Sequence, residues 1–451
     1  MRDNNLLVVY LDFPTDPAQS FPALILKYLV RLGWSVTVVV FELGDKPKEV
    51  LEDWSGIQFL RITPPLNLFQ ALSLRLDSKR SRDMKALQLS ATKNRGENTM
   101  KSPYRNCGLV WAAANTVLNP FGKYSHLSRY AGRVLMKIHK TRPFSAVMSV
   151  YYGPFTSQLV ARQFAKESHL PWVALVKDYW SASEYSGLRV APPALRVFVS
   201  FKFALRRRME AKVLRDADIL LPHCQPVADY LRTFVPGAQM RILSNCYDEE
   251  DFNEDVPLKV STNGSIFTAL CLGQKAIFDR LDMLFDALSE LRISGKVHRD
   301  DFRLRFVGAE PKLIRSYAEA YSCSDLVDAI PVVSHKEAIS LLKQASCLLF
   351  PNRSHFLPRR TPEYMAARKP VLGFPWDETS ASQQVLEMYG GATFARNSCE
   401  IATTLYEWYR AFRAGNSICT SIQEPFVQSY KASNRALELQ EILSQVLKIS
   451  A

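Results

Sequence analysis

The chain has 451 residues, which at about 150 residues per domain predicts two or three domains rather than one small module. Apolar residues make up 47% and charged residues 22%, a balance that argues against a disordered chain, a collagen-like repeat or a coiled coil. The formal net charge is +13, and residues 1–255 carry most of it, with 34 Lys and Arg against 24 Asp and Glu.

No run of about 18 uninterrupted apolar residues occurs, so we expect neither a membrane span nor a secretory signal, and we expect a cytoplasmic protein. Eight cysteines are present, without a Cys-x-x-Cys pair and without a histidine cluster at metal-ligand spacing. This arrangement predicts neither a disulfide framework nor a metal site.

Short apolar runs alternate with amphipathic segments along the chain, a pattern typical of α/β units around parallel sheets. In the first half we expect strands at residues 6–11, 36–41, 57–62, 146–150, 172–176 and 219–222. Helices are expected between most of them. Phe21 to Leu32, for example, is apolar on more than one side and is followed by Gly33, so we expect a helix that lies on a sheet face.

Residues 75–105 interrupt this pattern. They hold nine basic residues against three acidic ones and show little periodicity, which predicts a mobile basic insertion. A solvated loop and a contact with an anionic surface explain the insertion equally well.

After the polar residues 248–255 and the segment STNGS at 261–265 the alternation starts again. The second set of expected strands is 267–273, 304–308, 346–350 and 371–374, with helices such as 281–291 and 336–344. We therefore predict an α/β fold with two Rossmann-like domains, residues 1–255 and 256–421, facing a cleft at the carboxyl ends of their strands. Residues 422–451 are expected to hold a terminal helix that crosses back to the first domain, with packing on the second domain as the alternative.

The most informative block is FPNRSHFLPRRTPEYMAARKPVLGFP, residues 350–375. A strand is expected to end at Phe350, and a helix to begin near Thr361 and Pro362 with Glu363 in its first turn. Arginines at 353, 359 and 360 precede that helix, which suits an anion such as a diphosphate. Helix capping with solvated arginines is the alternative.

This block resembles the retaining, nucleotide-sugar-dependent glycosyltransferases of the GT-B fold, family 4 (group 1) in particular. Members commonly carry an acid four residues after a strand-end proline and a second acid eight residues further on. Here Pro351 is followed by His355 at the first position and by Glu363 at the second. Arg360-Thr361-Pro362-Glu363-Tyr364-Met365-Ala366 is similar to a version frequent in the branch that builds bacterial surface polysaccharides.

Four further blocks share the resemblance in the same order. Residues 214–252 resemble one family segment, except that Cys246 stands where members usually have a Gly. Residues 304–311 resemble another, except that Glu310 stands where members have a second Gly. Residues 271–291 resemble a third family segment. Gln274 stands where members usually have an Arg, and Asp279-Arg280 stands where they usually have Lys-Gly. Residues 149–181 match at their end, at Lys177, Asp178 and Trp180.

The resemblance implies a metal-independent transferase without a cofactor, because backbone N–H groups and fixed cations can stabilise the charge that develops on the departing nucleoside diphosphate. Glu363 would accept hydrogen bonds from ribose hydroxyls. The implied donor-binding residues are Gly273, Gln274, Lys275, Arg280, Gly308, Arg360 and Glu363. The implied catalytic residues are Lys177, Asp178 and His355, and the implied acceptor-binding residues are Asp12, Tyr152 and Gly153.

The first-half residues have structural alternatives. Asp12 can cap a loop, Lys177 can form a salt bridge, and Tyr152 with Gly153 can simply end a strand. Asp216 and Asp218 run straight into the expected strand at 219–222, where we expect Asp218 to cap or to pair locally rather than to bind a metal.

Residues 188–208 mix apolar side chains with six Arg and Lys residues, which suits an amphipathic helix on an anionic bilayer as well as a helix packed in the domain. No nucleic-acid-binding signature accompanies the basic half.

We expect a UDP- or GDP-sugar as donor, an oligosaccharide or lipid-linked acceptor, and a cytoplasmic protein that can lie on the membrane surface. The alternatives are a non-catalytic protein of transferase fold at the membrane surface, and a nucleotide-sugar epimerase or hydrolase of the same fold.

Overall fold

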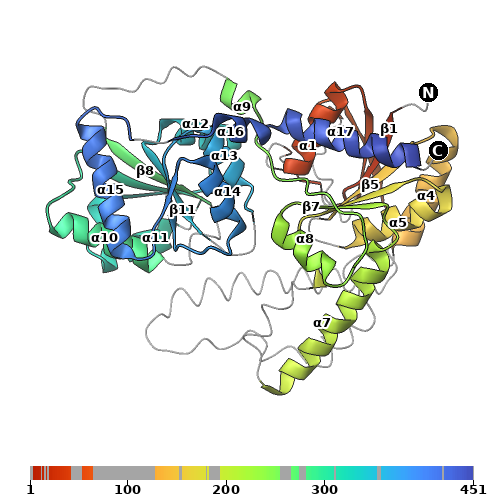
Figure 1. Ribbon diagram of the computed structural model, residues 1–451, viewed down its shortest axis with the longest axis horizontal. Coiled ribbons are helices and arrows are strands. Elements are labelled where there is room, and N and C mark those ends of the chain that lie inside the picture. Colours follow the sequence, from red (N-terminus) through yellow and green to blue (C-terminus); the bar gives the residue numbers. More distant parts are fainter. Residues whose placement is uncertain are drawn as a thin grey trace.

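The computed structural model describes residues 4–11, 13–14, 17, 20–41, 53–63, 127–151, 155–178, 180–181, 193–253, 266–273, 281–308, 311–352, 357–418 and 421–449 (Figure 1). The basic insertion at 75–105 and the predicted domain boundary at 255 lie outside the described residues. Within the described part of the chain, the strands form two separate sheets.

The first sheet has seven strands in the order β3-β4-β2-β1-β5-β6-β7. These strands are β1 (Asn5–Val9), β2 (Ser35–Phe41), β3 (Asp53–Trp54), β4 (Ile57–Ile62), β5 (Ala146–Tyr151), β6 (Trp172–Val176) and β7 (Ile219–Pro222). All neighbours pair in parallel except β3 with β4. The six strands expected from apolar runs are confirmed, and the two-residue β3 is an unexpected antiparallel edge.

Six described helices belong to this half of the chain. They are α1 (Phe21–Arg31), α4 (Ser128–Thr141), α5 (Thr156–Ser168), α7 (Pro193–Leu214), α8 (Gln225–Arg232) and α9 (Glu250–Asn253). The first nine residues of α1 are all buried, as expected for a helix that is apolar on more than one side. In Figure 1, α7 projects away from the rest of this domain.

The second sheet has six strands in the order β10-β9-β8-β11-β12-β13, all parallel. These strands are β8 (Phe267–Leu272), β9 (Phe302–Val307), β10 (Val327–Ile330), β11 (Cys347–Pro351), β12 (Val371–Phe374) and β13 (Ala392–Phe394). The four expected strands form its centre. The two edge strands, β10 and β13, were not predicted.

Helices cover this second sheet and continue to the end of the chain. They are α10 (Leu281–Ile293), α11 (Pro311–Ala320), α12 (His335–Gln344), α13 (Arg360–Ala366), α14 (Ala381–Tyr389), α15 (Ser398–Arg413), α16 (Glu424–Ser429) and α17 (Ala432–Ile449), with a 3-10 turn at Ser324–Leu326.

The terminal helix α17 returns to the first domain and lies along α1 (Figure 1). Its buried residues Leu439, Ile442 and Leu443 join the apolar core formed by α1 and the first sheet. Where the chain passes between the domains, the Tyr247 N–H donates to Tyr430 O at 3.1 Å and the Ala432 N–H donates to Tyr247 O at 2.9 Å. The expected crossover helix is therefore confirmed, and the two crossing segments are joined by main-chain hydrogen bonds.

Candidate active site at the domain interface

Lys177 and Asp178 directly follow β6, at the carboxyl end of the first sheet. Both side chains are partly buried, and the Lys177 Nζ lies 5.5 Å from the centre of the Phe21 ring. Burial lowers the pKa of Lys177 to about 8; the charge of Arg359 also lowers it, and that of Asp178 opposes the shift. Burial raises the pKa of Asp178, against the charge of Lys177. Lys177 is thus a cation in a poorly solvated place.

His223 follows β7, the neighbouring strand, and is 1% exposed. Its N–H donates to Val176 O at 3.3 Å, which holds it beside the Lys177 segment. Burial and the charge of Lys177 lower the pKa of His223 to about 3, so its ring is neutral at physiological pH. The structure thus places a buried neutral imidazole next to the Lys177 segment.

A buried carboxylate supports the same segment from α7. Glu210 is fully buried, and its Oε2 accepts hydrogen bonds from the Ser181 N–H at 3.2 Å and the Ser181 hydroxyl at 2.5 Å. Trp180 stacks on Phe155 with 4.4 Å between the ring centres. Glu210 could not be identified from the sequence, because its contact with Ser181 joins residues 29 positions apart.

In the second domain, Gly273 and Gly308 lie at the ends of the adjacent strands β8 and β9. Their φ angles are 137° and 88°, in the region that favours glycine. The Gly273 N–H donates to Val307 O at 3.0 Å, and the Gly308 N–H donates to Ile330 O at 3.1 Å. Both glycines therefore turn the chain at the carboxyl ends of neighbouring strands.

Arg360, in the first turn of α13, binds the ends of two strands. Its Nη1 donates to Leu272 O at 2.5 Å and its Nη2 to Pro351 O at 3.3 Å. The Tyr364 hydroxyl bridges the same strands: it accepts from the Leu272 N–H at 3.0 Å and donates to Leu349 O at 3.2 Å. Arg360 is therefore held by two main-chain carbonyls at the strand ends.

Glu363 pairs with Arg359, one helical turn earlier. The Arg359 Nη2 also lies 3.3 Å from His335 Nδ1. The charge of Arg359 also contributes to the lowered pKa of Lys177 in the first domain. A second contact joins the domains nearby, where the Asn245 Nδ2 donates to Leu357 O at 2.5 Å.

The described members of the predicted site fall into three places. Lys177 and Asp178 lie together at the first sheet, Gly273, Gly308 and Arg360 lie at the strand ends of the second, and Glu363 lies one turn beyond Arg360. The other predicted site residues lie outside the described residues: Asp12, Tyr152, Gly153, Gln274, Lys275, Arg280 and His355.

The described residues contain no group of three His, Cys, Asp or Glu side chains that could hold a metal ion. Asp216 pairs with Arg162 and Lys166, and the Asp218 Oδ2 accepts from the Trp172 N–H at 2.7 Å. Arg162 and Trp172 lie 54 and 46 residues before their aspartates, so these are long-range contacts and not the capping or local pairing expected for Asp218. None of the described helices has both the length and the hydrophobicity needed to cross a bilayer.

Comparison with solved structures reveals the same two-domain fold in proteins of low sequence identity. A glycosyltransferase from Rickettsia africae is 12% identical, with a TM-score of 0.64 over 99% of this chain and 100% of its own. Sucrose-phosphate synthase from Thermosynechococcus elongatus is 14% identical, with a TM-score of 0.61 over 99% of both chains. HepE from Anabaena, solved with UDP, is 12% identical, with a TM-score of 0.61 over 98% of this chain and 100% of its own.

A search of curated proteins gives no significant match. Residues 267–409, from β8 into α15, match the family model described as "Glycosyl transferases group 1". The match covers the strand ends at Gly273 and Gly308 together with the Arg360 and Glu363 segment, so the resemblance read from the sequence is confirmed. Residues 267–409 of the second domain are therefore similar to group 1 glycosyltransferases, and the chain as a whole has the GT-B fold.

Proposed function

We propose that the protein is a retaining, metal-independent glycosyltransferase that moves a sugar from a UDP- or GDP-sugar to an oligosaccharide or lipid-linked acceptor. The observation that carries the proposal is the match of residues 267–409, which include the Arg359–Glu363 pair, to group 1 glycosyltransferases. Lys177, at the carboxyl end of β6 in the first domain, is proposed as a second cation of the site.

The proposed roles follow from the chemistry of the departing nucleoside diphosphate. Glycosyl transfer leaves negative charge on the diphosphate, and groups that meet this charge in the transition state accelerate the reaction. Lys177 and Arg359 supply positive charge on the two sides, and the turns at Gly273 and Gly308 let the backbone approach the phosphates. Glu363 accepts hydrogen bonds from the ribose hydroxyls.

HepE from Anabaena was solved with UDP-glucose as well as UDP, which supports a nucleotide sugar as the donor. The same fold occurs in a putative UDP-N-acetylglucosamine 2-epimerase from Listeria monocytogenes, with a TM-score of 0.52 and 10% identity. Fold alone therefore does not separate transfer from epimerisation. The match of residues 267–409 to a transferase family favours transfer.

The basic surplus of the first half and the exposed Phe201 and Arg208 on α7 support an acceptor presented at an anionic membrane surface. On this proposal the protein acts at the cytoplasmic face of the membrane. A water-soluble oligosaccharide is the alternative acceptor.

Thermal-shift measurements with UDP-, GDP-, dTDP- and CMP-sugars test the donor. A ligand at about 100 times its dissociation constant stabilises a protein by about 2.7 kcal/mol, so a binding donor raises Tm clearly. The best donor is then incubated with and without acceptor oligosaccharides. Release of nucleoside diphosphate that needs an acceptor supports transfer, conversion of the sugar without an acceptor indicates an epimerase or hydrolase, and binding without turnover indicates a non-catalytic protein.

A further inference from the structure

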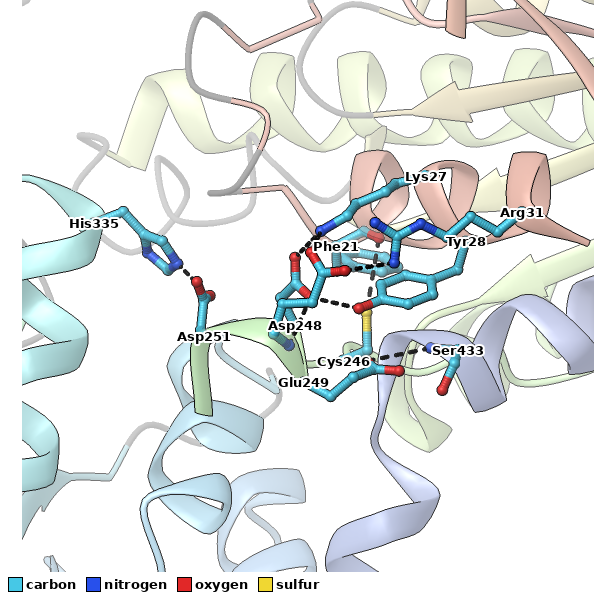
Figure 2. A network of polar contacts seen from close by, with 11 residues as sticks. Phe21, Lys27, Tyr28, Arg31, Cys246, Asp248, Glu249, Asp251, His335 and Ser433 are labelled. Carbon is cyan, nitrogen blue, oxygen red and sulfur yellow. Dashed lines mark hydrogen bonds and ion pairs between the residues drawn. The ribbon is translucent and has the colours of Figure 1, made fainter. Parts of the chain in front are cut away.

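Four consecutive acidic residues, 248–251, connect three parts of the molecule (Figure 2). We call these residues the acidic clasp. Their partners lie on α1 of the first domain, at the start of the crossover helix α17 and on α12 of the second domain: Asp248 pairs with Lys27, Glu249 with the Ser433 N–H, Glu250 with Lys27 and Arg31, and Asp251 with His335. Among the contacts of the described residues, the one between Asp251 and His335 reaches the second domain.

The end of the clasp in the first domain is firmly held. Lys27 Nζ lies 2.6 Å from Asp248 Oδ2 and 2.5 Å from Glu250 Oε2, and the Tyr28 hydroxyl donates to Asp248 Oδ1 at 2.7 Å. Lys27 and Asp248 are both buried. Burial alone would lower the pKa of Lys27, but its two acidic partners outweigh it and raise the pKa. The clasp is thus fixed to α1 by a Lys27–Asp248 pair that water hardly screens.

The other end rests on His335, the first residue of α12. Its Nε2 lies 2.7 Å from Asp251 Oδ2, and the side chain is 12% exposed. Burial lowers the pKa of His335 and Arg359 opposes protonation, but the hydrogen bond to Asp251 and the charges of Glu363 and Asp251 leave the pKa raised. The strand β8, which also packs against α12, carries no charged residue.

The two ring nitrogens of His335 have different partners. Nε2 faces the carboxylate of Asp251, whereas Nδ1 lies 3.3 Å from Arg359 Nη2, a group that can only donate. One neutral tautomer satisfies both sides, with the proton on Nε2 and the lone pair on Nδ1. The same Arg359 nitrogen pairs with Glu363. A continuous chain of contacts therefore runs from the clasp through His335 and Arg359 to Glu363.

We propose that His335 is a positioning residue that ties the donor-site pair Arg359–Glu363 to the interdomain clasp at Asp251, so that donor binding depends on this contact between the domains. The inference rests on the proposed function, in which Glu363 binds the ribose of a nucleotide sugar. His335 contacts neither substrate in this scheme. It holds the arginine that holds the carboxylate.

A direct consequence is that donor binding depends on pH. Protonation puts a hydrogen on Nδ1, so His335 no longer accepts from Arg359, and its charge repels the guanidinium and attracts Glu363. The carboxylate is then engaged by a second cation and is less available to the ribose. We expect the affinity for a nucleotide sugar to fall about two- to tenfold as the pH falls through the pKa of His335, the range expected for one hydrogen bond.

The test uses two variants of His335, each of which keeps the hydrogen-bonding role of one ring nitrogen. His335→Asn places an acceptor oxygen near the position of Nδ1, and His335→Gln places an N–H near the position of Nε2. Asp251→Asn keeps an acceptor for His335 but removes the charge that raises its pKa. His298→Gln, an exposed histidine at the amino end of β9, is the matched control. Each protein is titrated calorimetrically between about pH 5.5 and 8.5, a range in which histidine titrates, with the nucleotide sugar that binds the wild type best.

At the high end of this range we expect His335→Asn to bind within about twofold of the wild type and His335→Gln to bind about two- to tenfold more weakly. Neither variant should show the pH step, and in Asp251→Asn the step should move to lower pH. The role of His335 is overturned by a step that survives in both His335 variants or keeps its midpoint in Asp251→Asn. It is also overturned by an affinity that rises with falling pH in the acid half of this range, where Lys177 is charged. If no nucleotide sugar binds the wild type, the proposed function itself fails.

Discussion

Glu210 of α7 holds Ser181, the residue three positions beyond Asp178, by its main-chain N–H at 3.2 Å and its hydroxyl at 2.5 Å. Arg206, one turn earlier on the same helix, lies over the Trp180 ring at 5.4 Å from its centre. The helix α7 therefore fixes the segment that carries Lys177 and Asp178. A ligand or partner that moves α7 would therefore also move the segment that carries Lys177 and Asp178.

Glu210 is expected to make stability depend on pH. Burial raises its pKa from 4.5 to about 7, against the hydrogen bonds from Ser181, so the folded protein binds a proton that the unfolded chain has lost. The free energy of unfolding should therefore fall by about 3 kcal/mol as the pH rises from 4.5 to about 7. In Glu210→Gln, which resembles the protonated acid, this fall should be absent. Chemical unfolding at a series of pH values measures how the free energy of unfolding changes with pH. The same change in the wild type and in Glu210→Gln would show that Glu210 is not its source.

Lys177 should give donor binding a second pH limit, on the alkaline side. Its pKa is lowered to about 8, mainly by burial, so the side chain loses its charge as the pH rises past that value. Nucleotide-sugar affinity should then fall about 10- to 100-fold, the range of a hydrogen bond to a charged group. Lys177→Arg stays charged and should bind with little change up to about pH 10, because arginine has a pKa above 12. Calorimetric titrations across this range decide the matter, and the same alkaline fall in Lys177→Arg would assign it to another group.

Removal of the Glu363 carboxylate should weaken donor binding without unfolding the protein. Glu363→Ala loses the proposed acceptor of the ribose hydroxyls, at a cost of about 1.5–3 kcal/mol of binding free energy. Arg359 keeps His335 as a partner in this variant. Glu407→Ala, at an exposed position of α15, serves as the control. Unchanged affinity in Glu363→Ala, measured by calorimetry, would remove Glu363 from the site.

The buried ion pair of the clasp should matter strongly for folding. Lys27→Met leaves the buried Asp248 without its cation, and breaking such a pair costs about 3–5 kcal/mol. Adding Asp248→Asn to Lys27→Met gives a double variant in which the uncompensated charge is gone, and this variant should recover part of the lost Tm. Lys312→Met, at an exposed position of α11, should change Tm little. A double variant less stable than Lys27→Met alone would show that Asp248 does not need its cation.

The central strands of both sheets could be predicted from the sequence because parallel strands are buried on both faces and appear as short apolar runs. β10 and β13 were missed because they are short edge strands, partly exposed to solvent, and lack such a run. Gly273 and Gly308 were expected as the last residues of two strands, whereas each turns the chain directly after its strand with a positive φ that favours glycine.

The contacts that support the site could not be read from the sequence. Asp251 and His335 are 84 residues apart and meet only because the two domains fold against one another. Arg359 and Glu363 are an exception, since a spacing of four residues on a helix is a known signal for an ion pair. The sequence drew attention to Arg360, whereas the structure binds that guanidinium to two carbonyls and leaves Arg359 beside Glu363.

The proposed membrane contact is best tested at one arginine of α7. Arg206 lies over Trp180, and Arg207 lies over Phe234 and donates to Thr233, so substitution of either would disturb packing as well as charge. Arg208 is exposed. If α7 approaches an anionic bilayer, Arg208→Gln should weaken binding to vesicles that contain acidic lipid by about 1 kcal/mol at low salt, and added salt should reduce the difference. The matched control is Lys448→Gln, at an exposed position of α17. Co-sedimentation that is equal with neutral and acidic vesicles and insensitive to salt would remove the membrane contact and favour a water-soluble acceptor.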